Sequence, residues 1–500
     1  MYAAVPSATL TGVAATPVGV EAHLARGLPS VTIVGLPDAA VREARERVRA
    51  ALASSGFELP RTRILINLSP AHLRKEGPAL DLPIALALLA ADGRVPAAAA
   101  AARMACAELT LDGRLRPVRG AFAVGLLALE RSLPLLVAPE DGHGLAALDG
   151  LDVAGAATLG DAVALLRGTR AAIRPAAGTP PPTPPSPDLR DVRGLAQARY
   201  ALEVAATGGH AMLLTGPPGS GKTLLAQRLP GLLPDLSRDH ALETTRIHSS
   251  AGRPAEHGLL RRPPFRAPLP GVSYVGLIGG GRIPRPGEVS LAHRGVLFLD
   301  EVAEFPRGHL EALRQPLEEG VVAVDRLQAR SRFPAAFQLV AARNPCPCGW
   351  YGCEPPRCRC HPSAVRRYLA RPSGPILDRI DLHVRLPAPD PATIVAAPPG
   401  EDTATVATRV AQARARAQAR ATSGPSRPDA DADADGLPPR LRDAARGLVQ
   451  DMRLSARGWV RLLRVARTLA DLDAEEELAE RHLRAAAQFR LPEPDPVSPA

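Results

Sequence analysis

The feature that most constrains this chain is a glycine-rich loop between an apolar run and an amphipathic segment. The loop consists of Gly216, Pro217, Pro218, Gly219, Ser220, Gly221, Lys222 and Thr223. It matches the pattern G-x-x-x-x-G-K-[ST], with AMLLT before it as a strand and TLLAQRLPGLL after it as a helix. In such loops backbone N–H groups surround a phosphate, the lysine reaches the β and γ oxygens, and the hydroxyl ligates Mg²⁺. The sequence therefore predicts an α/β nucleotide-binding domain with ATP and Mg²⁺ as its ligands.

The choice of basic residue at position 222 supports this interpretation. Only two of the 61 basic residues are lysines, Lys75 and Lys222. A compact ammonium can act as a point charge inside a tight phosphate loop, whereas a planar guanidinium cannot. A lysine at this place in an arginine-rich chain indicates that the loop requires the smaller cation.

Two further apolar runs end in polar residues suited to hydrolysis. GVLFLDE (295–301) predicts a buried strand that presents Asp300 to Mg²⁺ and Glu301 to the attacking water, unless it ends in an ordinary solvated turn. FQLVAARNP (337–345) predicts a strand between the phosphate loop and the acids, with Asn344 at its tip. A neutral amide there can contact the γ-phosphate and the water together. An ordinary Asn-Pro turn is the alternative.

Shifts in composition divide the chain. SVTIVGL and RILINLS predict strands, AAVREARERVRAALASSG predicts a helix, and a Pro-rich stretch and SGPSRPDADADADG (423–436) predict linkers. The predicted units are an α/β domain at 1–170, a Pro-rich linker at 171–188, an ATPase core at 189–390 that includes a cysteine-rich loop at 346–361, a helical segment with a flexible linker at 391–436, and a helical lid at 437–492.

The net charge and the hydropathy of the chain limit which partners and which cellular location are expected. The formal net charge of +10 fits a partner that carries phosphates, such as DNA, although arginines scattered on solvated helix faces would give the same value. We find no apolar run of the roughly 18 residues that a membrane span needs, so a membrane partner is not expected. The first residues lack the basic-then-apolar plan of a signal peptide, which predicts a cytoplasmic protein.

Five of the six cysteines crowd into the cysteine-rich loop, which is a poor disulfide framework. Four soft ligands in a short loop suit tetrahedral Zn²⁺, and buried or free thiols are the alternative. The best zinc ligands would be Cys346, Cys348, Cys358 and Cys360, with Cys353 or His361 as substitutes.

Longer segments carry a resemblance to a known family. DVRGLAQARYALEVAATGGHAMLLTGPPGSGKT, RIPRPGEVSLAHRGVLFLDE, LRQPLEEG, FQLVAARNPCPCG, SGPILDRIDLHV and LSARGWVRLLRVARTLADL resemble the Mg-chelatase-like AAA+ ATPases of the YifB/ComM type. The resemblance covers nearly the whole chain. It implies a ring-forming, hexameric DNA motor, similar to the branch-migration helicase that supports recombination of incoming DNA in natural transformation. Because Mg-chelatase subunits share this core, a remodelling or chaperone motor acting on a protein partner is the alternative.

The resemblance also implies roles for individual residues. They are Lys222 and Thr223 as the Walker A pair, Asp300 and Glu301 as the Walker B pair, Asn344 as sensor 1, Arg379 in ILDRIDLHV as the arginine finger, and Arg457 in LSARGW as sensor 2 with Arg464 as the alternative. An arginine finger acts in the neighbouring subunit's site, which couples hydrolysis to ring assembly. Two departures stand out: Leu269 and Pro270 replace the histidines of the family segment RAPHH, and Arg343 replaces a methionine.

The first domain resembles the Lon-type protease fold through RKEGPALDLPIALALL and ELTLDGRLRPVRGAF. The resemblance places Ala79 where the nucleophilic serine would be and Phe122 where its lysine partner would be. Without a hydroxyl and an amine there is no activated nucleophile, so we expect an inactive scaffold or collar.

The segment 318–337 predicts a β-hairpin with Arg326, Arg330 and Arg332 at its tip. In ring motors of this kind such a hairpin faces the pore, and its arginines could grip a phosphate backbone without reading sequence. An ordinary solvated turn is the alternative.

Overall fold

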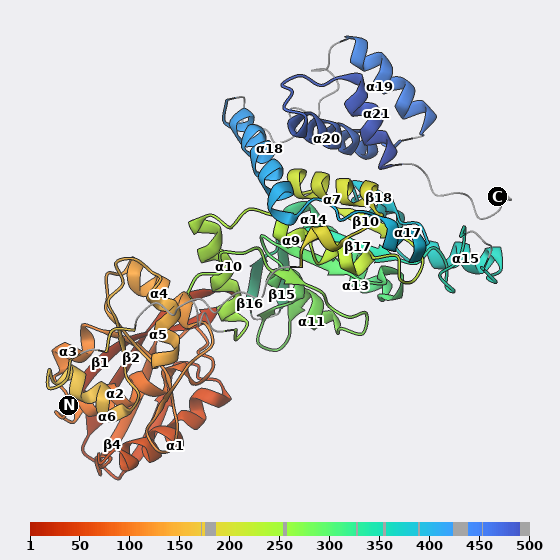
Figure 1. Ribbon diagram of the computed structural model, residues 1–500. Coiled ribbons are helices and arrows are strands. Elements are labelled where there is room, and N and C mark those ends of the chain that lie inside the picture. Colours follow the sequence, from red (N-terminus) through yellow and green to blue (C-terminus); the bar gives the residue numbers. More distant parts are fainter. Residues whose placement is uncertain are drawn as a thin grey trace.

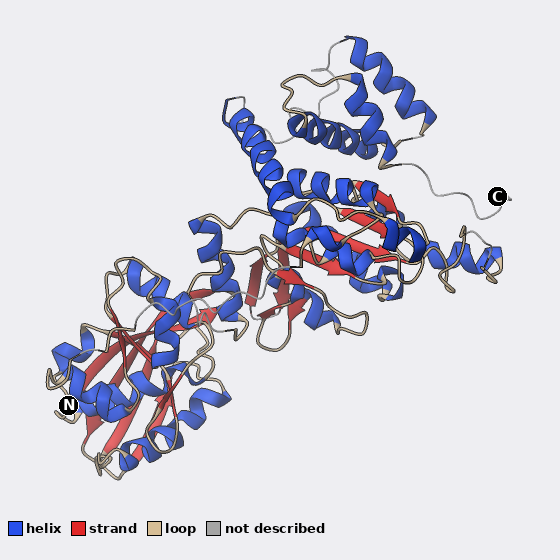
Figure 2. Cartoon of the chain, in the orientation of Figure 1, coloured by secondary structure: helices blue, strands red, loops and turns tan. Residues whose placement is uncertain are grey.

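The computed structural model describes residues 1–171, 173–175, 187–253, 258–326, 329–353, 357–388, 391–423, 439–452 and 454–490. The proline-rich stretch at 176–186 and residues 424–436 of the second expected linker lie outside these ranges. Figure 1 shows an N-terminal α/β part, a central α/β part and a group of C-terminal helices, and Figure 2 shows that strands are found in the first two. Among the described residues, no helix is long and apolar enough to cross a membrane.

The N-terminal part contains a four-stranded mixed sheet in the order β1-β2-β4-β3. The first two strands were not predicted, although side chains alternate between buried and exposed along them, which is the signal of a half-covered sheet. The β3–β4 pair is parallel and the others are antiparallel. The strands are β1 (Tyr2–Thr11), β2 (Ala14–Ala25), β3 (Ser30–Val34) and β4 (Arg63–Ser69).

Helices and short strands complete this part. All residues of α2 are buried, as expected for a helix that is apolar on every side. A second, parallel sheet has the order β5-β8-β9. The elements are α1 (Ala39–Ser54), η1 (Pro78–Leu80), α2 (Asp81–Ala91), α3 (Ala97–Ala101), β5 (Met104–Cys106), β6 (Glu108–Leu109), β7 (Leu115–Arg116), α4 (Ala121–Glu130), β8 (Leu135–Val137), α5 (Pro139–Leu145), β9 (Val153–Gly155) and α6 (Leu159–Leu166).

The central part is built on a five-stranded parallel sheet in the order β11-β14-β17-β10-β18. Side chains from both of its faces are buried in apolar clusters, which explains why its strands appear in the sequence as continuous apolar runs. The strands are β10 (Met212–Thr215), β11 (Phe265–Arg266), β14 (Val296–Leu299), β17 (Gln338–Arg343) and β18 (Leu382–Arg385).

Short helices and two hairpins surround this sheet. The elements are η2 (Leu189–Asp191), α7 (Ala196–Gly208), α8 (Lys222–Ala226), α9 (Leu229–Leu232), α10 (Arg238–Ser250), α11 (Tyr274–Ile278), β12 (Gly279–Gly280), β13 (Arg285–Pro286), α12 (Glu288–Leu291), η3 (Val302–Glu304), α13 (Arg307–Ala312), α14 (Arg314–Glu319), β15 (Val321–Arg326), β16 (Ala329–Pro334), α15 (Pro362–Leu369), α16 (Gly374–Leu377) and α17 (Pro391–Ala396).

The prediction of one continuous helix after the phosphate loop is wrong. The segment divides into α8 and α9, separated by a tight turn in which Arg228 N–H donates to the Leu225 carbonyl. Pro230 lies in the first turn of α9, where its missing N–H is tolerated, but it could not continue an unbroken helix from α8.

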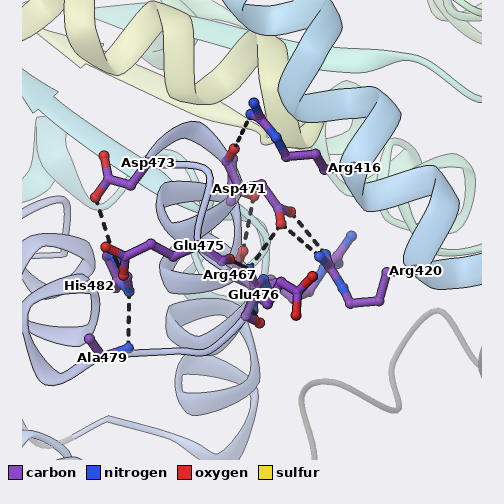
Figure 3. A network of polar contacts seen from close by, with 11 residues as sticks. Arg416, Arg420, Arg467, Asp471, Asp473, Glu475, Glu476, Ala479 and His482 are labelled. Atoms are coloured by element: carbon purple, nitrogen blue, oxygen red, sulfur yellow. Dashed lines mark hydrogen bonds and ion pairs between the residues drawn. The ribbon is translucent and has the colours of Figure 1, made fainter.

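The C-terminal region consists of the helices α19 (Pro439–Asp451), α20 (Ala456–Leu472) and α21 (Glu480–Gln488), reached from the core through the long helix α18 (Thr403–Ser423). Asp471 of α20 joins this group to α18, as Figure 3 shows. Arg420 donates to both carboxylate oxygens of Asp471 at 2.7 and 2.9 Å, and Arg416 donates to its backbone carbonyl at 2.9 Å. Arg467 also bonds this carboxylate, at 3.0 Å.

The N-terminal part contacts the central part at several places. Gly120 N–H donates to the Ser249 carbonyl at 3.0 Å, which joins the start of α4 to α10. Val13, between β1 and β2, belongs to the same apolar cluster as Phe333 of β16. These contacts bring the first hairpin of the chain against the β15–β16 hairpin of the central part.

Candidate active site

The phosphate loop connects β10 to α8 at the carboxyl edge of the central sheet, where parallel α/β sheets bind their ligands. Gly219 and Gly221 have φ angles of +76° and +90°, a left-handed backbone that glycine adopts without strain. At Gly216 a side chain would meet Leu386, because an added Cβ would lie 2.9 Å from the Leu386 Cβ. The glycines of the pattern are therefore required by the shape of the turn.

Lys222 is buried at the centre of the loop. Its Nζ donates to the carbonyl oxygens of Gly216 and Pro217 at 2.7 and 2.9 Å, and to Asn344 Oδ1 at 3.1 Å. Burial lowers the pKa of the Lys222 ammonium below its usual value, while the nearby carboxylates of Asp300 and Glu301 oppose that shift. The cation and the predicted sensor amide are thus neighbours.

Thr223 and Asp300 meet as a Mg²⁺ site requires. The Thr223 Oγ1 donates to Asp300 Oδ2 at 2.7 Å, across the space between α8 and the end of β14. The other carboxylate oxygen, Oδ1, accepts the backbone N–H of Glu301 at 3.0 Å. Hydroxyl and carboxylate oxygens are the hard ligands that Mg²⁺ prefers, so these two residues fit the ion.

Glu301 has a backbone conformation that is uncommon for its type. Its φ is +51°, in the left-handed region, directly after β14 and before η3. Such strain costs about 1 to 3 kcal/mol and tends to occur at functional sites. The turn carries an exposed carboxylate next to Asp300.

Asn344 follows β17, and β17 lies between β10 and β14, as the sequence predicted. The backbone of Asn344 also lies beside the phenol of Tyr368 of α15, a contact that sequence reasoning missed. Burial raises the pKa of the Tyr368 phenol above its usual value. A tyrosine in a polar, arginine-rich helix is a weak sequence signal, and its proximity to Asn344 is evident only from the tertiary structure.

Arg343, which departs from the family pattern, is buried beside the sensor. Strand register places it next to Thr215, and its Nε donates to Thr215 Oγ1 at 3.3 Å. Burial lowers the pKa of this guanidinium to about 10. The second departure, Leu269, is exposed, and Arg266 of the same segment pairs with Glu288 at 2.5 Å.

The two family-derived arginines lie together, away from the phosphate loop. Arg379 is 4% exposed and forms an ion pair with Glu318 of α14, and Arg457 lies 3.8 Å from the same carboxylate. Among the described residues, none of the polar contacts found for either arginine reaches Lys222 or Asn344. In this chain both arginines lie beside Glu318 of α14.

The alternative sensor residue Arg464 is exposed, whereas Arg461 of the same helix hydrogen bonds to the core. Arg461 donates to Asp381 Oδ1 at 2.5 Å and to the Arg379 carbonyl at 2.7 Å. Burial disfavours the ionised form of Asp381, yet the nearby His210 ring and the Arg461 guanidinium hold the pKa of this carboxyl well below its usual range. Sequence reasoning missed this contact, since several arginines of α20 share the same spacing.

The best four cysteines come together as the sequence suggested. The sulfurs of Cys346, Cys348, Cys358 and Cys360 all lie within 4.8 Å of one another. The proposed substitute His361 is instead occupied at the start of α15, where its Nδ1 accepts the Ser363 N–H at 3.3 Å.

The expected hairpin at 318–337 is present as β15 and β16. The placement of all three arginines at its tip is wrong, because the register pairs Arg332 with Ala323, well back from the Arg326–Ala329 pair at the turn. Arg332 is exposed, and the side chains of Arg326 and Arg330 lie outside the described residues.

Comparisons with known proteins identify the family of this chain. Three family models match: magnesium chelatase, subunit ChlI, at residues 188–394, subunit ChlI of Mg-chelatase at 20–142, and the ChlI C-terminal domain at 400–490. The chain is 43% identical over 482 residues to protein YifB of Escherichia coli strain K12, which covers 96% of this chain and 95% of that protein. It belongs to the YifB/ComM-type Mg-chelatase-like proteins. The competence protein ComM of Haemophilus influenzae is 39% identical over 487 residues, with 96% and 95% covered, and protein Rv2897c of Mycobacterium tuberculosis is 44% identical over 483, with 95% of each covered. The central part is accordingly an AAA+-type ATPase domain.

Proposed function

We propose that the protein is an ATP-hydrolysing ring motor that acts on DNA, a ComM-like branch-migration helicase that supports recombination of incoming DNA. The observation that carries the ATPase part is the convergence of Lys222, Thr223, Asp300 and Asn344 at one edge of the central sheet. The DNA part is supported by the likeness to a competence protein and by the net charge of +10.

Each of these residues has a separate role in ATP hydrolysis. Lys222 stabilises the charge on the β and γ oxygens, and Mg²⁺ held by Thr223 and Asp300 would neutralise more of it. Glu301 orients the attacking water and accepts its proton. Asn344 holds the γ-phosphate and the water in line without adding charge. Since Asn344 already bonds Lys222, its amide is oriented toward the phosphates.

The site is completed in a homo-oligomeric ring, which we take to be a hexamer. Arg379 and Arg457 share Glu318, and a subunit interface beside α14 would let them act on the neighbouring subunit's γ-phosphate. Burial of Arg379 means that it must exchange Glu318 for the phosphate when the ring forms. Such an exchange would couple hydrolysis to assembly.

The N-terminal domain acts as a collar without protease activity. Ala79 and Phe122 pack in one apolar cluster, at the positions where the Lon-type resemblance would place a serine and a lysine. An alanine methyl and a phenyl ring supply neither a nucleophile nor a base.

The β15–β16 hairpin is the element we assign to DNA. Arg332 is exposed on it, and the hairpin stands next to the N-terminal collar through the Phe333 and Val13 cluster. Backbone contacts of this kind are independent of sequence and weaken as salt rises.

The test is the ATPase rate of the purified full-length protein at fixed salt, with and without forked or single-stranded DNA. We expect DNA to raise the rate several-fold and its binding to weaken with salt. Lys222→Ala is the control, which loses nucleotide binding and all turnover. A wild-type rate that DNA leaves unchanged, together with DNA binding that is absent at every salt concentration, would instead favour a remodelling motor acting on a protein partner.

A further inference from the structure

Four thiols in the cysteine loop have the spacing of metal ligands. The Cys346 sulfur lies 3.3 Å from that of Cys348 and 3.7 Å from that of Cys358, and the Cys348 and Cys358 sulfurs are 3.6 Å apart. Four sulfurs bound at about 2.3 Å around a tetrahedral centre lie about 3.8 Å apart. A disulfide would require a sulfur separation near 2.05 Å, so these are separate thiols.

The surroundings favour thiolates at this place. Cys360 N–H donates to the Cys358 sulfur at 3.5 Å, and backbone N–H donors stabilise the negative charge of bound thiolates. Cys346 is fully buried, whereas Cys348 is exposed, which leaves one side of the cluster open for an ion to enter. Soft thiolate ligands in a tetrahedral set select Zn²⁺ over harder cations.

The loop that carries the cysteines touches the phosphate loop. Cys346 follows the sensor Asn344 by two residues, so its position sets the direction of the chain at the sensor. Gly349 packs on Pro218 so closely that an added Cβ would lie 2.6 Å from the proline Cδ. The cysteine loop therefore borders the nucleotide site on two sides.

The helix after the loop continues this contact. Tyr368 of α15 lies beside the Asn344 backbone, and Arg371, just beyond α15, donates to Glu304 at 2.7 Å and to the Ala303 carbonyl at 3.0 Å. Ala303 and Glu304 belong to η3, which directly follows Glu301. One rigid loop at the start of α15 would fix the sensor and support the strained turn of Glu301.

We propose that Cys346, Cys348, Cys358 and Cys360 bind one Zn²⁺ ion, and that this ion braces Asn344 and Pro218 for ATP hydrolysis. Binding converts the four thiols to thiolates and releases four protons to solvent, with no change of oxidation state. The metal site stands on the thiol geometry alone, whereas its effect on turnover rests on the proposed ATPase function.

Metal content tests the site itself. Full-length protein purified under reducing conditions with added zinc should contain one zinc per chain by elemental analysis. Cys358→Ser and Cys360→Ser should each lose most of it, while Cys353→Ser, in the same loop but outside the four, should keep it. Wild-type protein without zinc or with iron in its place, or equal loss in Cys353→Ser, would overturn the proposal.

The rate of ATP hydrolysis tests whether the zinc ion supports Asn344 and Pro218. Removing zinc from the wild-type protein with a strong chelator should lower kcat about tenfold, and added zinc should restore it. Because this comparison uses one unchanged chain, a folding defect in a variant cannot imitate the result. Zinc loss with an unchanged kcat would show that the ion does not support ATP hydrolysis, although the four cysteines would still bind zinc. A zinc-loaded protein that never hydrolyses ATP would count against the proposed function instead.

Discussion

The phosphate loop and the region around Glu318 are both built from charged residues of the central part, but they differ in completeness. At the phosphate loop a single chain brings together the cation, the metal ligands and the sensor amide within hydrogen-bond distance. Around Glu318 two arginines share one carboxylate in the same chain. Under the proposed function the first region binds a nucleotide within one chain, whereas the second gains a catalytic role only if a neighbouring subunit supplies the phosphate.

This difference separates two kinds of motif. Walker-type residues lie near one another because adjacent strands end at one edge of the sheet. In the proposed ring, Arg379 would instead act on a phosphate held by another subunit. Four substitutions can test whether the phosphate loop acts within one chain while the arginines near Glu318 act on the neighbouring subunit.

The largest effect is expected at Arg379. Arg379→Ala should lower turnover by about 10³-fold, because the transition-state charge loses its partner, while ATP binding to the chain persists. Mixing Arg379→Ala with Lys222→Ala subunits should restore part of the rate, since some interfaces then combine an intact loop with an intact arginine. Mixtures as inactive as either variant would place Arg379 outside the neighbouring site.

Glu301→Gln should keep ATP bound and lower hydrolysis by about 10² to 10³-fold, because the amide can orient water but cannot take its proton. Single-turnover measurement with labelled ATP separates binding from cleavage. Because this defect lies in the subunit that binds ATP, addition of Lys222→Ala subunits should not restore activity. Near-normal turnover would remove Glu301 from the chemistry.

Asn344→Ala should lower kcat by about 10²-fold with a smaller change in KM, because the amide acts on the water and γ-phosphate more than on the rest of the nucleotide. Steady-state kinetics over a range of ATP concentrations measures both constants. Asn344→Asp should be no better, since it adds charge beside the phosphates. A rise in KM alone would make Asn344 a binding residue.

The smallest effect is expected at Glu318. This carboxylate is 49% exposed, so its ion pair with Arg379 contributes only about 0.5 to 1 kcal/mol of stability. Glu318→Gln should lower the thermal midpoint slightly and change turnover less than about threefold. Scanning calorimetry and the ATPase assay provide the measurements. A loss as deep as that of Arg379→Ala would mean that Glu318 itself is needed for chemistry.

The sequence by itself determined three of the five central strands (β10, β14 and β17), the order of the phosphate loop, acids and sensor, and the three C-terminal helices. These features depend on local patterns: apolar runs, glycines that need positive φ, and helical spacing. It did not predict β1 and β2, and it merged α8 with α9 across Pro230. The local pattern of β1 and β2 was too weak to predict them, and the helical pattern across Pro230 was given too much weight.

Only the tertiary structure decided which charges meet. In a chain with many arginines, spacing cannot say that Arg461 reaches Asp381, or that Arg379 and Arg457 share Glu318. The same holds for the contact of Gly349 with Pro218 and of Tyr368 with Asn344. Such pairs join segments distant along the chain, and their geometry is set by how helices pack on the sheet. Periodicity reports the face a residue occupies, and packing alone determines the partner it finds there.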